Sequence, residues 1–320
     1  MGERAVGTRA VAVPWPVRPR GAARRRGLAD DAYRGLLTAF ALFVFVVAAL
    51  IVYESARGSV LSIRTFGWGF FVSTEWDPVA DRFGALPYLY GTVVSSAIAM
   101  LLAVPLGLGA AVFLAELAPR RLGDAVAFVV ELLASIPSIV YGIWGLFVLA
   151  PFLRGLVEPW LARHLGFLPL FQGYPFGIGM LNAGIVLAIM VLPTIVSLSR
   201  EILLSTPRAL REASLALGST RSEAIGVVLD AARPGILGAV ILGLGRALGE
   251  TMAVTMVIGN SNRISASLLA PGSTMASVIA NEFTEATGDL YLSALVEIAL
   301  VLFVLTLLVN AVARALVHWA

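Results

Sequence analysis

The chain has 320 residues, of which 59% are hydrophobic and only 13% are charged, and its mean hydropathy is +0.90. This composition does not fit a soluble domain and predicts a membrane protein. The sequence has no cysteine, and all 23 of its basic residues are arginine. These absences exclude disulfides, thiolate metal sites, Schiff-base lysines and the lysine of a phosphate-binding loop, so ATP hydrolysis would require another chain.

The first segment, residues 1–35, is rich in Arg, Ala, Pro and Gly and lacks a repeating apolar face. We expect it to be a mostly disordered cytoplasmic tail, because low hydrophobicity and high charge leave little to bury. Its arginines would act as a topology signal, and contact with anionic lipid headgroups is the alternative.

Six apolar runs follow, each long enough for the roughly 20 residues that a membrane-spanning helix needs. They lie near residues 36–54, 88–114, 126–152, 176–199, 235–258 and 291–317. Lipid offers the backbone no hydrogen-bond partners, and the alternating pattern of barrel strands is missing. The runs therefore predict an all-α membrane protein with six transmembrane helices. Pro105, Pro137 and Pro193 predict kinks or local unwinding.

The distribution of arginines predicts the orientation of the chain. One alternate set of connections is rich in arginine, whereas the opposite set holds only Arg57, Arg64, Arg82, Arg154, Arg163 and Arg263. We therefore expect both termini in the cytoplasm. The external connections are too short for a separate domain. Residues 36–87 are expected to form the first helix and its external loop, and residues 88–320 the main transmembrane domain.

The segment 200–234 is the only sizeable polar insertion between spans, and we expect it to form two short cytoplasmic helices. Leu210, Ala213 and Leu217 give the first helix an apolar stripe, and Gly218 is placed to end it in a left-handed conformation. A short helix with one apolar face suits a groove on a partner protein. A helix lying on the lipid surface is an equally good interpretation of the local pattern.

The second of these helices is predicted by a capping box, in which Thr220 and Glu223 have the required spacing. In this motif the side chain of each of the two residues accepts a hydrogen bond from the backbone N–H of the other at the start of the helix. We expect this helix to be short and to end before the fifth apolar run.

Arg246 and Glu250 lie within the fifth apolar run, where a charge costs on the order of 3 kcal/mol even on the lenient insertion scale. Four residues apart on one helix, they would share a face. A guanidinium matches two oxygens of an oxyanion, so we interpret Arg246 as part of a transport path and Glu250 as the group that holds it. A purely structural ion pair and a bond from Glu250 to a neighbouring subunit are the alternatives.

Other polar residues in the spans carry weaker signals. Ser135, Ser138 and Tyr141 could line a path opposite Arg246, although serines often bond back to their own helix. Glu297 lies near the start of its span, where we expect a partnered polar group close to the headgroups.

Three segments carry a resemblance to a known family. Residues 212–218, EASLALG, resemble the EAA loop of ABC importer permeases. Residues 243–260, GLGRALGETMAVTMVIGN, and residues 135–145, SIPSIVYGIWG, are similar to phosphate-specific permeases of the PstC type. The resemblance covers about 88–317. One departure is Asp230, which stands where the family pattern has a proline.

The resemblance implies a type I ABC importer permease (MetI-like) fold and a subunit that translocates inorganic phosphate across the bacterial inner membrane, without cofactor, metal or nucleic acid. It also implies a second, homologous permease (PstA type), two ATPase subunits (PstB type) and an extracytoplasmic phosphate-binding protein (PstS type). The residues implied to contact the ATPase are Arg211, Glu212, Ala213, Ser214, Leu217 and Gly218.

Other functions remain open on the residues alone. A sulfate or molybdate permease would meet the same electrostatic requirement, and Glu250 could serve as the proton carrier of an ion-coupled anion transporter. An intramembrane protease is improbable, because the chain lacks the GxSG, GxGD and HExxH patterns.

Overall fold

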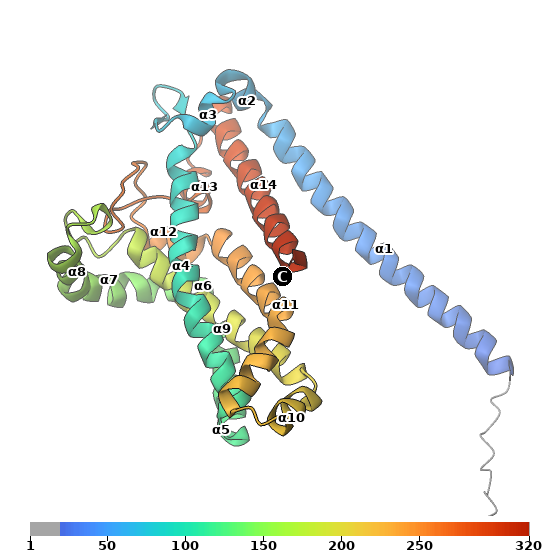
Figure 1. Ribbon diagram of the computed structural model, residues 1–320. Coiled ribbons are helices and arrows are strands. Elements are labelled where there is room, and N and C mark those ends of the chain that lie inside the picture. The colour runs from blue at the N-terminus through green and yellow to red at the C-terminus, as the bar shows by residue number, and fades with distance from the viewer. Residues whose placement is uncertain (1–19, 320) are drawn as a thin grey trace, which may run out of the picture. The chain divides into compact units, whose positions relative to one another are not determined.

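The computed structural model describes the backbone of residues 20–319 and the side chains of residues 30–315 (Figure 1). In that part of the chain, six helical segments are long and apolar enough to cross a membrane. They are Asp30–Gly58, Leu86–Leu117, Ser138–Leu165, Met180–Ser205, Arg221–Leu248 and Asp289–Ala315. The predicted all-α class and the predicted number of transmembrane helices are confirmed, and a two-stranded antiparallel hairpin is the small exception.

The first half of the chain contains one long helix, the hairpin and then a second long helix. The elements are α1 (Arg20–Gly58), α2 (Val60–Phe66), α3 (Gly69–Val72), β1 (Trp76–Asp77), β2 (Arg82–Phe83), α4 (Leu86–Val112), the π-helical turn η1 (Phe113–Leu117), α5 (Arg120–Ala134), α6 (Ser138–Trp144), the π-helical turn η2 (Gly145–Leu149), α7 (Ala150–Phe152), the π-helical turn η3 (Leu153–Val157), α8 (Glu158–Leu165) and the 3₁₀ turn η4 (Pro169–Phe171).

The second half contains three long helices joined by shorter ones. The elements are α9 (Met180–Ser205), α10 (Arg208–Ala216), α11 (Arg221–Leu248), α12 (Met252–Val257), α13 (Met275–Glu282) and α14 (Asp289–Trp319).

The chain divides into two compact units, residues 1–54 and residues 55–320. In the first unit α1 already begins at Arg20, so the disorder expected as far as residue 35 is wrong for residues 20–35. No proline follows Pro19 before the span, and Arg, Ala and Leu are good helix formers, so the apolar helix extends backwards. The rest of the expected tail, residues 1–19, lies outside the described residues.

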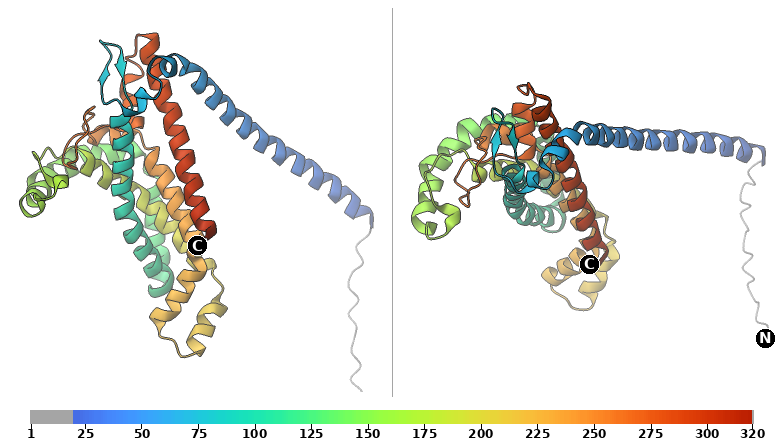
Figure 2. Two further views of the ribbon diagram at one scale, coloured as in Figure 1. Left: turned by 45° about the horizontal axis from the view of Figure 1, so that its top comes forward. Right: turned by 90° about the horizontal axis from the view of Figure 1, so that it is seen from above.

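In the second unit α9 is the central helix. It packs along α4 and against α11, and more of its apolar stretch is buried than in any other spanning segment of this unit. The views in Figures 1 and 2 agree that α11 (orange) lies beside α14 (red). A hydrophobic cluster that includes Phe70, Phe83, Tyr88 and Tyr291 joins the connection 55–87 to α4 and α14. The connection after the first helix is thus packed into the same unit as the main domain.

The predicted third span, 126–152, is wrong in its bounds, because the chain is broken between α5 and α6. Pro137 has no N–H to donate and forces the preceding residue away from helical geometry, and Pro137 itself is extended at φ −58°, ψ 139°. The spanning segment therefore starts at Ser138 and reaches Leu165. The helix continues through Pro105 in α4 and through Pro193 in α9, so unwinding occurs at only one of these three prolines.

The second of the two helices expected within residues 200–234 is not short. The predicted capping box at Thr220 and Glu223 is confirmed, but α11 runs on without a break through Pro234 to Leu248. The expected fifth span, 235–258, is correspondingly wrong at both ends. The helix stops at Gly249 and Glu250 before α12 begins. Asp230, the departure from the family pattern, is an exposed residue inside this continuous helix.

Candidate functional site

Two interrupted helices frame the candidate site (Figure 1). One interruption separates α5 from α6 at residues 135–137, and the other separates α11 from α12 at residues 249–251. Helices α6 and α12, which follow the two interruptions, pack against each other. Non-helical backbone at membrane depth is tolerated where protein or a water-filled path satisfies its polar groups, and broken helices are a recurring feature of transport sites.

The contact between α6 and α12 depends on a glycine. A Cβ atom added to Gly142 would lie 3.0 Å from the Ala253 Cα and 2.9 Å from the Met256 sulfur. The glycine therefore lets the two backbones approach closely, as small residues do between membrane helices. This approach brings the segment that carries Ser138 and Tyr141 next to the helix that follows Glu250.

Arg246 lies in the last turn of α11 and is exposed within this chain. Among the described residues it has neither an ion-pair partner nor a hydrogen-bond partner for its side chain. Helix α11 ends at the interruption before α12, and α12 packs against α6, which carries Tyr141, so the structure brings the segments of these two predicted residues into one region. The guanidinium is thus free to engage a group from outside the chain.

Glu250 does not share a helix with Arg246, and the expected i, i+4 pair is wrong. The helix ends at Leu248, and Gly249 and Glu250 are not helical. No proline directly follows Leu248, so the local sequence did not predict this end. Glu250 instead accepts a hydrogen bond through Oε1 from the Ala253 N–H at 3.3 Å. Thr251 is the N-cap residue of α12 and makes no side-chain cap bond, so Glu250, one residue before it, satisfies a free amide in the first turn of this helix.

The remaining predicted path residues make local bonds. Ser135 donates through Oγ to the Leu132 carbonyl at 2.7 Å. This is a bond to the serine's own helix, as serines often make, and not a bond across a path. Tyr141 donates its hydroxyl to the Leu133 carbonyl at 2.8 Å and so closes the break between α5 and α6. Ser138 is half-buried at the first position of α6. Tyr141 and Ser138 stay beside the break, whereas Ser135 satisfies the end of α5.

The segment 200–234 contains the helix predicted from its apolar stripe. Helix α10 has Leu210, Ala213 and the following Leu217 exposed, and Leu217 is 90% exposed. Gly218 has φ +88°, so the predicted left-handed end is confirmed. Glu212 is also exposed, whereas Ser214 is half-buried. The hydroxyl groups of Ser214 and Ser219 form a hydrogen bond of 2.6 Å. Within the described part of the second unit, the apolar stripe of α10 is thus exposed to a varying degree, least at Leu210 (37%) and most at Leu217.

Arg211 attaches α10 to the rest of the second unit. It forms an ion pair with Glu116 at the end of α4 and η1, and its Nε donates to both carboxylate oxygens at 3.0 and 3.1 Å. The guanidinium also donates to the backbone carbonyls of Thr206 and Leu203, at 3.1 and 2.9 Å. Hydrogen bonding to Glu116 raises the pKa of Arg211 above its usual value, so the arginine stays charged at all physiological pH values.

Sequence reasoning missed Glu116. Arg221 donates to its backbone carbonyl at 2.9 Å as well, so one acidic residue organises both ends of the α10 connection. The partner of Arg211 is 95 residues away in the sequence, and no local pattern could have found it. Within the described part of the chain, no three His, Cys, Asp or Glu side chains converge as metal ligands would.

Comparison with known proteins gives matches over most of the chain. It is 50% identical over 296 residues to the phosphate transport system permease protein PstC of Mesorhizobium japonicum, a match that covers 91% of this chain and 90% of that protein. It is 44% identical to the PstC protein of Haemophilus influenzae, with 90% and 93% coverage. A solved inward-facing structure of the MetNI methionine ABC transporter aligns with a TM-score of 0.49 at 20% identity, over 73% of this chain and 93% of that one.

The family described as binding-protein-dependent transport system inner membrane component matches residues 103–319. That region includes both helix interruptions, α10 and all the predicted site residues. The chain therefore belongs to the family of binding-protein-dependent transport system inner membrane components, the multi-pass permease subunits of ABC transporters.

Proposed function

We propose that this chain is the transmembrane permease subunit of an ATP-driven importer that translocates inorganic phosphate. Phosphate is proposed as the substrate because the chain is 50% identical, over about nine-tenths of both chains, to a relative named as a phosphate permease. The charge of the proposed path agrees with an anionic substrate. Sulfate and molybdate are the competing substrates of the same class.

Arg246 is the residue that we propose to meet the phosphate. It is exposed at the end of a broken helix, lies near Tyr141, and has no ionic partner in the described chain. A guanidinium can donate two parallel hydrogen bonds to two phosphate oxygens. Ser138 and Tyr141 border the same interruption and would contact the passing anion, while Ser135 and Glu250 hold the ends of the neighbouring helices.

Helix α10 is proposed to couple transport to ATP hydrolysis. Its exposed apolar stripe suits a groove on an ATPase subunit, and its tie through Arg211 to Glu116 gives a rigid route from that groove to the membrane helices. The specific partners we propose are a PstA-type second permease, two PstB-type ATPases and a PstS-type binding protein. The alternative of a helix lying on lipid makes the different prediction that α10 cross-links only to lipid.

This role requires α10 to be cytoplasmic, and we therefore propose that both termini are cytoplasmic as well. The concentration of arginines in the same alternate set of connections supports that orientation. We also propose that residues 88–320 carry the transport path and that residues 1–87, of which 55–87 pack onto this region, take no direct part in transport.

Uptake into proteoliposomes tests the proposal. The complete complex should accumulate labelled phosphate only with ATP and binding protein, and an excess of unlabelled phosphate should compete where sulfate or molybdate do not. Uptake driven by an ion gradient without ATP would instead support the ion-coupled alternative. The chain has no cysteine of its own, so a cysteine at Leu217 can be cross-linked to cysteines on the ATPase, and a cysteine at exposed Val79 in the external connection is the matched control.

A further inference from the structure

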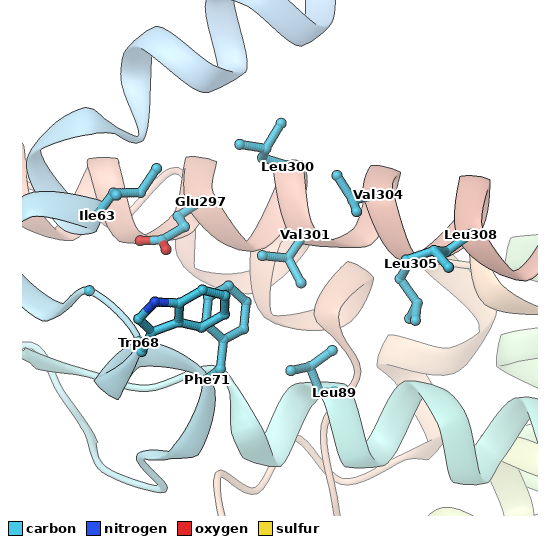
Figure 3. Close-up of a pocket in the computed structure, with 11 residues that line it drawn as sticks. Ile63, Trp68, Phe71, Leu89, Glu297, Leu300, Val301, Val304, Leu305 and Leu308 are labelled. Atoms are coloured by element: carbon cyan, nitrogen blue, oxygen red, sulfur yellow. The ribbon is translucent and has the colours of Figure 1, made fainter.

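A pocket remote from both helix interruptions lies between α2, α3, α4 and the first half of α14 (Figure 3). Its volume is about 530 Å³. Its walls are apolar apart from one carboxyl group, Glu297, and they include Ile63, Leu89, Val301 and Leu305. None of these residues belongs to the proposed transport path or to α10, so the transport function leaves the pocket unexplained.

Glu297 is the unusual member of this pocket. The residue is only 2% exposed, and its Oε2 atom has no hydrogen-bond partner among the described residues. The Ser62 hydroxyl on α2 faces this carboxyl, yet neither Ser62 Oγ nor Glu297 Oε2 has a partner within hydrogen-bond distance among the described residues. The expected partner of Glu297 is therefore adjacent to it but not bonded to it. A buried carboxyl oxygen without a donor is costly, so the site favours a donor that enters the pocket or a small shift of Ser62.

The pocket is polar at one end and apolar over the rest of its length. Figure 3 shows the Glu297 carboxyl beside Ile63 and Trp68, whereas Val304, Leu305 and Leu308 lie further along α14. From Glu297 to Leu308 the helix rises about 16 Å, which is close to half of the roughly 30 Å hydrocarbon thickness. Trp68 is exposed at the polar end, where tryptophan favours the membrane interface. The shape matches one chain of a lipid in one leaflet.

We propose that this pocket binds a membrane lipid with a primary ammonium headgroup, such as phosphatidylethanolamine. The ammonium donates an N–H hydrogen bond to Glu297 Oε2, and one acyl chain lies along Val301, Leu305 and Leu308. Charge selects this class of lipid, because a carboxyl group repels an anionic headgroup. The need for an N–H donor separates it from a quaternary ammonium of equal charge, which has no N–H to give.

Native mass spectrometry of the purified complex tests this site. The complex is equilibrated in vesicles that contain equal amounts of phosphatidylethanolamine, phosphatidylcholine and phosphatidylglycerol, and the retained lipids are counted. We expect phosphatidylethanolamine to exceed each of the others by about tenfold, the ratio that one charge-assisted hydrogen bond supports. Equal retention of the three lipids would overturn the proposal, because the Glu297 carboxyl would then not select a headgroup.

Variants locate the selectivity. Glu297→Gln keeps the shape of the side chain and should reduce the preference to about onefold, whereas Glu131→Gln, at an exposed carboxylate on α5, should retain it. Val301→Trp fills the pocket and should lower the retention of all three lipids. Preserved selectivity in Glu297→Gln would contradict the proposal. If a variant fails to assemble, a photo-reactive residue in place of Val304 tests the proposal in its stead. A cross-link to lipid would support the proposal, and a cross-link to protein would overturn it by showing that a polypeptide fills the pocket.

Discussion

Arg211 and Arg246 are the same residue type in opposite situations. Arg211 is satisfied by a carboxylate and by two backbone carbonyls, whereas Arg246 has no such partner in the part of the chain that the structure describes. A guanidinium has five N–H donors, and those of Arg211 are largely committed to η1, to the end of α9 and to Thr206 just after it. The partnered arginine holds two elements together, and the unpartnered one is available to a ligand.

This difference is the reason why we propose a mechanical role for Arg211 and a binding role for Arg246. Arg211 lies in the first turn of α10 and Arg246 in the last turn of α11, and both carry a permanent charge. Only the surrounding acceptors distinguish them. Substitution of each should therefore affect a different measurement, namely the transport per ATP hydrolysed for Arg211 and the uptake of phosphate itself for Arg246.

The largest effect is expected for Arg246→Gln. Loss of two charge-assisted hydrogen bonds of roughly 1.5 kcal/mol each should lower phosphate uptake about a hundredfold, while assembly with the ATPase remains intact. Initial uptake rates in proteoliposomes measure this effect. The control is Arg233→Gln, an exposed arginine on the same helix. Near-normal uptake by Arg246→Gln would remove this residue from the path.

The next effect is expected for Arg211→Ala, which leaves the Glu116 carboxylate half-buried without its partner. A cost of about 2 kcal/mol in the attachment of α10 should lower the phosphate transported per ATP hydrolysed more than tenfold. Simultaneous measurement of ATPase activity and uptake gives this ratio. Arg208→Ala, on an exposed position of the same helix, is the control.

A double-mutant cycle with Glu116→Ala separates coupling from general damage. Because the two residues contact each other, the double variant should be little worse than either single one. Fully additive losses would mean that the ion pair does not transmit anything between α10 and the membrane helices.

A smaller effect is expected for Gly218→Val. The φ of +88° at this position costs a β-branched residue about 1–2 kcal/mol, so the end of α10 should be redirected and ATPase subunits should dissociate more readily in detergent. Gly226→Ala is the matched control, since Gly226 lies inside α11 with open space around it and should tolerate the methyl group. Retention of the ATPase at the wild-type level would show that the left-handed end does not aim this helix.

The smallest effect is expected for Glu250→Gln. If Glu250 acts as a cap for α12, the amide oxygen of glutamine can still accept the bond from Ala253, and uptake should fall by a few-fold at most. Glu250→Ala removes the acceptor and should destabilise the fold by about 1 kcal/mol, measured by thermal unfolding of the complex. A collapse of uptake in Glu250→Gln would instead indicate that its charge serves Arg246 or a proton.

Local rules predicted the features that depend on a few neighbouring residues. Pro137 predicted an interruption, Thr220 and Glu223 predicted the start of a helix, and Gly218 predicted a left-handed helix end. The physical causes are a missing N–H, a reciprocal pair of side-chain bonds and the absence of a Cβ atom, and all of them act within one helical turn. Hydropathy likewise predicted six spans, because lipid forces the backbone of each to satisfy itself.

Only the tertiary structure decided the arrangement of the charges. Helix α11 runs past the expected membrane boundary, packs against α4, α9 and α14, and ends at Leu248, which separates Glu250 from Arg246. The pairing of Arg211 with Glu116 and the burial of Glu297 also depend on contacts between distant segments. The sequence alone determined the class, the number of spans and the candidate residues, whereas the bounds of two spans and the partners of these residues depend on long-range packing that no local period encodes.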